Sequence, residues 1–222
     1  MSRERLTAIV AAYHRHRFAW LFVSLLVTLG AGSTLHALVP RYNALGMLLA
    51  LNLLAAIASV AREGHLRLQL SLGMAFVAAR GLRAILGGSS MLAVSEVLWL
   101  TTIVLATMAT VRHAFRRGTV DPERILAALD AYLLAGLLFA VAYWMLDQTW
   151  PGSFGGSSSG RLDLPDAIYF SFVTIATLGY GDVLPVAPAA RGLAMVEGVS
   201  GQMYLTVLVA RLVSLFSKQR DD

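Results

Sequence analysis

Long apolar segments limit this chain to one class of fold. Of its 222 residues, 57% are hydrophobic and 14% are charged, whereas soluble domains contain about 25% charged residues. A helix needs about 20 apolar residues to cross a hydrocarbon core of about 30 Å, and its backbone polar groups must all be paired there. The sequence therefore predicts an all-α membrane protein with six transmembrane helices. We expect them at residues 18–39, 43–61, 66–86, 90–111, 125–147 and 189–216.

The basic residues predict how these helices are oriented. If the helices alternate in direction, most arginines flank connections on one side of the membrane, and only Arg41, Arg161 and Arg191 flank the other. The positive-inside rule then predicts a plasma-membrane protein with both termini in the cytoplasm. The net charge of +5 does not indicate nucleic-acid binding, because the basic residues are scattered and form no single stripe. The residues expected on the cytoplasmic side are Arg3, Arg5, Arg15, Arg17, Arg62, Arg67, Arg112, Arg116, Arg117, Arg124, Arg211, Lys218 and Arg220.

A polar interruption at residues 112–124 is the best candidate for a domain boundary. We expect a four-helix membrane domain at residues 1–117 and a second domain at residues 118–222. Asp121 and Pro122 are typical of a helix start, since aspartate caps the first turn and proline fits the first helical position.

A shorter apolar segment, residues 166–177, cannot span the membrane. It lies between the last two predicted helices, and Asp163 and Pro165 are typical of a helix N-terminus just before it. We interpret residues 166–176 as a re-entrant helix that enters the membrane and returns on the same side. Its C-terminus carries about half a negative charge from the helix dipole, which favours a cation nearby. The Gly- and Ser-rich connection at residues 147–165 is predicted to be a flexible extracellular loop.

The hexapeptide that follows this helix, residues 177–182, reads Thr-Leu-Gly-Tyr-Gly-Asp. Non-helical backbone is tolerated at membrane depth only where protein buries it or where it lines a water-filled path. The glycines permit positive φ values, which let successive carbonyl groups point the same way and replace the water shell of a potassium ion. The threonine hydroxyl can extend this column of oxygens. We therefore expect a selectivity filter that binds K⁺ through Thr177, Leu178, Gly179, Tyr180 and Gly181.

These residues resemble the pore module of the tetrameric potassium channels, whose filter reads Thr-Val-Gly-Tyr-Gly-Asp. Leu178 replaces the valine, and because the carbonyl oxygen is the ligand there, we expect selectivity to survive. The resemblance covers residues 125–216. It implies an outer helix at 125–147, a pore helix at 166–176, the filter at 177–182 and an inner helix at 189–216.

The same resemblance implies residues that support the filter. Asp182 matches the family's supporting aspartate, and Tyr169 occupies an aromatic position that can donate a hydrogen bond to it. Thr174 lies one turn before Thr177, and it either caps the pore helix or assists the lowest ion site. Three further matches around the filter are Pro165, Pro185 and Arg191.

The inner helix carries the residues expected to control opening. Gly201 matches the family's hinge glycine, and with Gly198 it permits either helix bending or close helix packing. Below it, an apolar ring can close the pore by losing its water, although contact with lipid or another helix remains an alternative. The residues of this ring are Leu205, Val209 and Val213. Glu197 is either a functional intramembrane acid or an acceptor of hydrogen bonds from the pore helix, and we favour the second role.

The first four predicted helices resemble the layout of six-span voltage-gated channels, with one departure. Voltage sensing needs several positive charges on the fourth helix, but residues 91–111 contain no Arg or Lys. Arg80 and Arg83 lie on the third predicted helix, and Glu96 can pair with one of them. We expect a structural Arg–Glu pair here and no classical voltage sensor, which leaves the gating stimulus open.

Together these features imply a homotetramer in a lipid bilayer that conducts K⁺ passively. K⁺ would be the permeant ion, with no cofactor and no enzymatic reaction, since no nucleophile, metal cluster or phosphate-binding loop stands out. A non-selective cation channel and a non-conducting regulatory subunit remain alternatives. A secondary transporter is disfavoured, because it would show paired broken helices in related halves of the chain.

Overall fold

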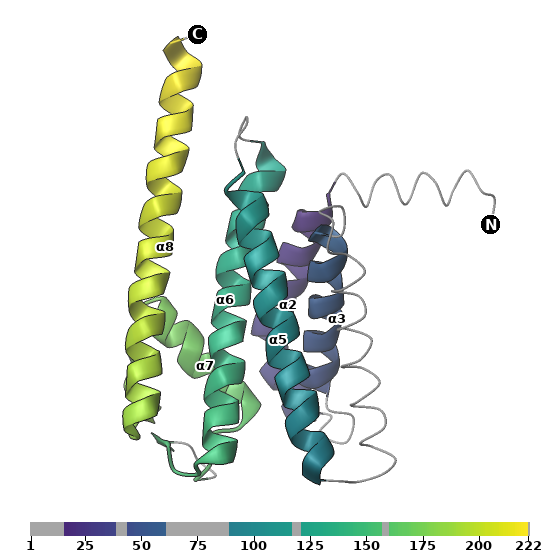
Figure 1. Ribbon diagram of the computed structural model, residues 1–222, viewed down its shortest axis with the longest axis vertical. Coiled ribbons are helices and arrows are strands. Elements are labelled where there is room, and N and C mark those ends of the chain that lie inside the picture. The colour runs from purple at the N-terminus through teal and green to yellow at the C-terminus, as the bar shows by residue number, and fades with distance from the viewer. Residues whose placement is uncertain (1–15, 39–43, 61–88, 117–120, 157–159, 222) are drawn as a thin grey trace, which may run out of the picture. The chain divides into compact units, whose positions relative to one another are not determined.

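The structure is a computed structural model that describes residues 16–38, 44–60, 89–116, 121–156 and 160–221 (Figure 1). It divides into two compact units, one comprising residues 1–131 and the other residues 132–222. We describe each unit separately.

The first unit consists of helices packed through apolar faces and one polar cluster. α2 (Arg17–Leu38) and α5 (Ser89–Ala114) both contact α3 (Ala44–Val60). Between α2 and α3, the buried Asn52 side chain accepts a hydrogen bond from the Ser24 hydroxyl and donates one to the Thr28 hydroxyl, both 2.5 Å long. A polar side chain is costly inside an apolar bundle unless it is paired, so this cluster fixes the contact between the two helices.

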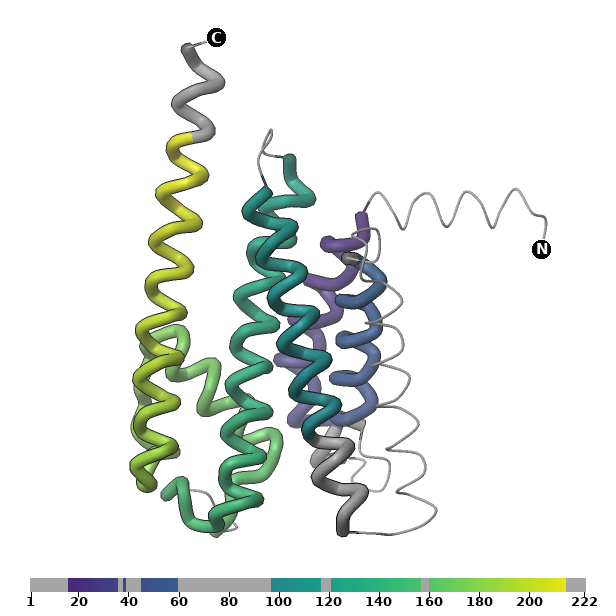
Figure 2. The backbone as a smooth tube through the Cα atoms, viewed as in Figure 1, coloured from purple at the N-terminus to yellow at the C-terminus, as the bar shows by residue number. Residues whose placement is uncertain are grey.

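The second unit contains two long helices, one short helix and a two-stranded sheet. α6 (Pro122–Thr149) begins in the first unit and runs through the second, followed by β1 (Phe154–Gly155), α7 (Leu164–Ile175), β2 (Leu184–Pro185) and α8 (Pro188–Asp221). β1 pairs with β2 in antiparallel fashion, with Phe154 opposite Pro185. Figure 2 shows that α7 starts near the C-terminal end of α6, and that the chain returns to this end before α8 begins.

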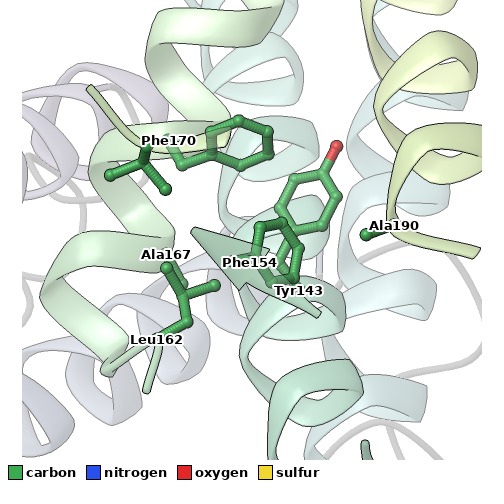
Figure 3. Close-up of a cluster of buried hydrophobic side chains, with 7 residues drawn as sticks. Tyr143, Phe154, Leu162, Ala167, Phe170 and Ala190 are labelled. Carbon is green, nitrogen blue, oxygen red and sulfur yellow. The ribbon is translucent and has the colours of Figure 1, made fainter. Parts of the chain in front are cut away.

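An aromatic cluster holds the second unit together at this end (Figure 3). The rings of Tyr143 on α6, Phe154 on β1 and Phe170 on α7 meet edge to face, with centroids 4.9–5.5 Å apart. Edge-to-face pairs contribute about 0.5–1.5 kcal/mol each beyond the area that they bury. Four smaller buried side chains complete the cluster, namely Leu162, Ala167, Val183 and Ala190. The cluster therefore joins α6, the sheet, α7 and the start of α8.

Four helices of the described residues are long and apolar enough to cross a membrane. They comprise Arg17–Leu35, Val97–Ala114, Pro122–Thr149 and Pro188–Ser214. These correspond to the predicted helices at 18–39, 90–111, 125–147 and 189–216. The helix predicted at 43–61 is present as the shorter apolar α3, and the one predicted at 66–86 lies outside the described residues.

Both predicted helix starts in the second half of the chain are confirmed in detail. The Asp121 side chain accepts a hydrogen bond from the backbone N–H of Arg124 at 2.8 Å, and α6 begins at Pro122. The Asp163 side chain caps α7 by accepting a hydrogen bond from the backbone N–H of Asp166, also at 2.8 Å. α7 begins two residues before the predicted start at 166. The predicted domain boundary at residue 118 stays a prediction.

Candidate functional site

The backbone of residues 177–181 alternates between two conformations. Thr177, Gly179 and Gly181 have φ values of 57°, 59° and 78°, whereas the two residues between them are not in the positive-φ region. In an ordinary strand successive carbonyl groups point to opposite sides. A backbone whose residues alternate between right-handed and left-handed conformations is different. It brings successive N–H groups to one side of the segment and the carbonyl groups to the other. The φ values of this segment are those expected of a backbone whose carbonyl oxygens face one way.

The N–H groups of this segment are fixed to the end of α7. Thr177 donates its backbone N–H to the carbonyl of Thr174 at 3.0 Å, and Leu178 donates to the carbonyl of Val173 at 2.9 Å. Gly179 also donates to the Val173 carbonyl, at 3.3 Å. Within the described part of the chain, no hydrogen bond ends on a carbonyl oxygen of residues 177–181. Those oxygens are therefore available for a ligand.

All five residues are exposed on the surface of a single chain, including the large side chains of Leu178 at 57% and Tyr180 at 67%. The structure thus brings together the five predicted ion-binding residues. The carbonyl group of Thr174 accepts a hydrogen bond at the end of α7, and a role of its hydroxyl in the lowest ion site stays a prediction.

Tyr169 and Asp182 lie beside this segment and contact each other. The Tyr169 hydroxyl donates a hydrogen bond to Asp182 Oδ2 at 2.7 Å, as the resemblance implied. The rings of Tyr169 and Tyr180 stack with centroids 6.5 Å apart. The hydrogen bond from Tyr169 lowers the pKa of Asp182 below its usual value of 3.8 and raises the pKa of Tyr169 to about 12. Asp182 is therefore held as a carboxylate, and its role in supporting the filter stays a prediction.

The predicted gating residues on α8 have different surroundings. A Cβ atom added at Gly201 would lie 2.5 Å from Ile175 Cγ1, whereas one added at Gly198 would meet nothing within 4 Å. Gly201 thus lets α8 approach the last residue of α7 closely. Val209 and Val213 are exposed, and Leu205 is half-buried. Their roles as hinge and gate stay predictions.

Comparisons with known proteins show what the chain is similar to. A family model described as an ion channel matches residues 131–218. The inward rectifier potassium channel Kirbac3.1 of Paramagnetospirillum magnetotacticum is 33% identical over 101 residues, which are 44% of this chain and 31% of Kirbac3.1. Two pore potassium channel c of Oryza sativa subsp. japonica is 34% identical over 88 residues, 38% of this chain and 19% of that channel. Protein LctB of Bacillus caldotenax is 34% identical over 115 residues, 49% of this chain and 84% of LctB.

The chain belongs to the potassium channel family. It is a membrane protein of the ion-transport class, and its apolar helices fit that assignment. It spans less than a third of the length of Kirbac3.1 and of the rice channel. The match covers α6 from Ala131, the segment 177–182 and most of α8, and α2, α3 and α5 lie outside it.

The acidic residues near the C-terminal end of α6 are mostly used within the fold. Asp147 is fully buried, and its two carboxylate oxygens accept hydrogen bonds from the backbone N–H groups of Ser153 and Leu162 at 3.1 and 2.8 Å. Asp163 and Asp182 are likewise used within the fold, the first as the cap of α7 and the second as the acceptor of the Tyr169 hydroxyl. The connection at 147–165, predicted to be flexible, is therefore tied to α6 at two points.

Two sets of contacts, one helical turn apart, fix α7 between the two long helices of the channel. In the first, Ser171 on α7 contacts Gly136 on α6 and Glu197 on α8. In the second, the Ile175 carbonyl accepts a hydrogen bond from the Tyr132 hydroxyl at 3.1 Å, and its side chain contacts Gly201. On each of the three helices the two contacting residues are four positions apart, so they lie on the same face of that helix. Tyr132 and Ser171 were not identified from the sequence, because one hydroxyl in an apolar helix matches no motif.

One further prediction concerns residues that the structure describes in part or not at all. Arg80 and Arg83 lie outside the described residues, and the structure describes only the backbone of Glu96. The expected Arg–Glu pair therefore stays a prediction.

The hydrogen bond between Tyr169 and Asp182 predicts how the channel responds to acid. Because the pKa of Asp182 is lowered, the bond contributes stability above the ordinary pKa of 3.8, and this contribution is lost as pH falls through the lower, folded value. A Tyr169→Phe variant removes the main cause of the shift, so its acid inactivation should occur at a higher pH than in the wild type. Flux from liposomes titrated from pH 7 to pH 3 on both sides measures the two midpoints. Equal midpoints would contradict a coupling between these residues.

Proposed function

We propose that this chain forms a homotetrameric, potassium-selective channel in which four copies of residues 177–181 surround the ion path. The observation that carries the proposal is the alternation of φ values along this segment, whose carbonyl oxygens accept no hydrogen bond among the described residues. Such an alternation lets successive carbonyl oxygens face one way. A dehydrated K⁺ ion needs oxygen ligands in place of its water shell, and carbonyl groups supply them without binding the ion irreversibly. Conduction is passive, K⁺ is the transported ion, and no cofactor or enzymatic step is involved.

Four copies are needed because one chain offers oxygens on one side only. In a tetramer the neighbouring copies would complete the coordination and would also cover the exposed side chains of Leu178 and Tyr180. α8 likewise exposes apolar side chains that a neighbour, the ion path or lipid must cover, including Met195, Val199, Met203, Val207 and Val213. Large exposed apolar surfaces of this kind mark contact sites.

The proposed topology has six membrane spans, with both termini in the cytoplasm and the protein in the plasma membrane. α7 acts as the re-entrant pore helix. The path of the chain in Figure 2 supports this role, because α7 starts at one end of the unit and the chain returns to the same end after it. Residues 1–117 form a four-helix domain without sensor arginines, and residues 118–222 form the pore domain. Gly201 serves as the hinge, and Leu205, Val209 and Val213 line the inner gate.

Ion flux from liposomes tests the function. Purified protein should pass K⁺ and Rb⁺ far better than Na⁺. A Na⁺ flux of equal size would favour the non-selective cation channel, and no flux of any cation would favour the non-conducting subunit.

A pair of Tyr180 variants tests the site. Tyr180→Ala should erase the preference for K⁺, because it removes the ring that stacks on Tyr169. Tyr180→Phe is the matched control, since it keeps the ring and removes only the hydroxyl, and it should retain the preference. If Tyr180→Ala is as selective as Tyr180→Phe, the segment 177–181 is not the filter.

A further inference from the structure

Glu197 lies at the centre of a closed group of three polar side chains and one backbone carbonyl in the second unit. Its carboxyl group contacts the Tyr143 hydroxyl through Oε2 and the Ser171 hydroxyl through Oε1, each at 2.5 Å. Ser171 Oγ also lies 2.7 Å from the carbonyl oxygen of Gly136. The side chains of Tyr143, Ser171 and Glu197 have no exposed surface. Within the described residues, these contacts account for every hydrogen bond of the Glu197 carboxyl group.

Counting protons decides the state of this group. Three contacts of hydrogen-bond length join the four residues, and each needs one proton between its two oxygens. Tyr143 supplies one proton, Ser171 supplies one, and the Gly136 carbonyl supplies none. If Glu197 were ionised, one pair of oxygens would face each other at 2.5–2.7 Å without a proton, which is repulsive. The third proton must therefore reside on Glu197, whichever way each hydroxyl points.

We propose that Glu197 is held as a neutral carboxylic acid and acts as a positioning residue for the pore helix. In this arrangement Glu197 donates through Oε1 to Ser171 Oγ, Ser171 donates to the Gly136 carbonyl, and Tyr143 donates to Glu197 Oε2. The chain of hydrogen bonds runs from α8 through α7 to α6. This proposal goes beyond the proposed function, because it assigns a role to a residue outside the ion-binding segment. The effect of Glu197 on conduction rests on the proposed function.

The position of Ser171 explains how this group can act on the filter. Ser171 lies one turn before Ile175, the last residue of α7, and two residues before Val173, whose carbonyl accepts the N–H groups of Leu178 and Gly179. A shift of α7 at Ser171 therefore moves the acceptor that orients the filter backbone. A neutral acid also suits a membrane interior, because an ionised carboxylate buried without a cation is strongly unfavourable.

Infrared difference spectroscopy tests the protonation state without any measurement of conduction. The wild-type channel in liposomes at neutral pH should show the carbonyl stretch of a protonated carboxyl group, and this band should be absent from Glu197→Gln. The subtraction of the two spectra removes bands from other buried acids. If no protonated-carboxyl band is lost in Glu197→Gln, Glu197 is ionised and the proposal is wrong, whether or not the protein conducts K⁺.

Two conservative variants test the positioning role. Glu197→Gln can donate from Nε2 to Ser171 and accept from Tyr143 at Oε1, so its K⁺ flux and K⁺ over Na⁺ preference should stay within about twofold of the wild type. Glu197→Asp keeps the acid but is too short to reach both hydroxyls, and it should lose about tenfold or more of its flux because buried partners are left unpaired. The opposite order, with Asp active and Gln inactive, would show that charge matters and would overturn the proposal. A wild type without K⁺ flux would count against the proposed function alone.

Discussion

We expect a Gly156→Ala variant to lose potassium flux and much of its stability. Gly156 has a φ of 89°, and a methyl group there would overlap the carbonyl oxygen of Asp182, the last residue of the segment 177–182. Backbone atoms on both sides of this contact cannot move aside as a flexible side chain can. The variant must therefore displace either the loop or the residue that accepts the Tyr169 hydrogen bond. We expect a destabilisation of more than about 3 kcal/mol, above the cost of the backbone conformation alone.

Gly152→Ala provides a matched control in the same loop. Gly152 also has a positive φ, 83°, but a Cβ atom there would meet nothing within 4 Å. Its substitution should cost only the left-handed conformation, about 1–2 kcal/mol, and leave flux near the wild-type level. Thermal unfolding in detergent and K⁺ flux from liposomes measure both variants. If the two alanines have equal effects, the contact between Gly156 and Asp182 does not position the segment 177–182.

We expect Gly201→Ala to reduce potassium flux about tenfold or more, as an overpacked buried contact would. The added methyl group would stand 2.5 Å from Ile175 Cγ1 and 3.3 Å from the Ile175 carbonyl oxygen. The variant would push α8 away from the end of α7 and disturb the hydrogen bonds that hold the segment 177–181 there. Gly198→Ala is the control, because it lies on the same helix with open space around it. The Gly198→Ala variant should be about 1 kcal/mol more stable, because alanine favours a helix more than glycine does, and it should conduct normally.

A double variant separates packing from bending at Gly201. If the loss arises from the contact, Ile175→Ala should restore part of the flux of Gly201→Ala, because it removes the side chain that the methyl group meets. If Gly201 is needed only as a flexible hinge, Ile175→Ala should give no rescue. A double-mutant cycle on K⁺ flux expresses the difference as a coupling between the two positions. The absence of any coupling would exclude the contact as the cause.

Features that depend on a few neighbouring residues could be predicted from the sequence. The caps at Asp121 and Asp163 follow from side chains that reach N–H groups three residues away. The positive φ values at Gly179 and Gly181 follow from glycine itself. Helix positions could be predicted because a membrane span requires a long apolar run, whatever other helices pack against it.

Features that depend on distant residues could not be predicted in this way. Thr177 has a positive φ of 57°, which nothing in a threonine side chain favours, so the end of α7 and the bonds around it must impose it. The burial of Asp147 between two backbone N–H groups depends on how the loop folds back. A contact between Glu197 and the pore helix was expected from the sequence, but its partner Ser171 and the further contact with Gly136 became visible only in the structure.

The most direct test of the central claim is an experimentally determined structure of the purified protein in a lipid nanodisc with K⁺. We predict four copies around one axis, with the carbonyl oxygens of residues 177–180 facing that axis and ion density between them. A monomer or dimer, or residues 177–181 turned toward lipid and away from any symmetry axis, would contradict the account.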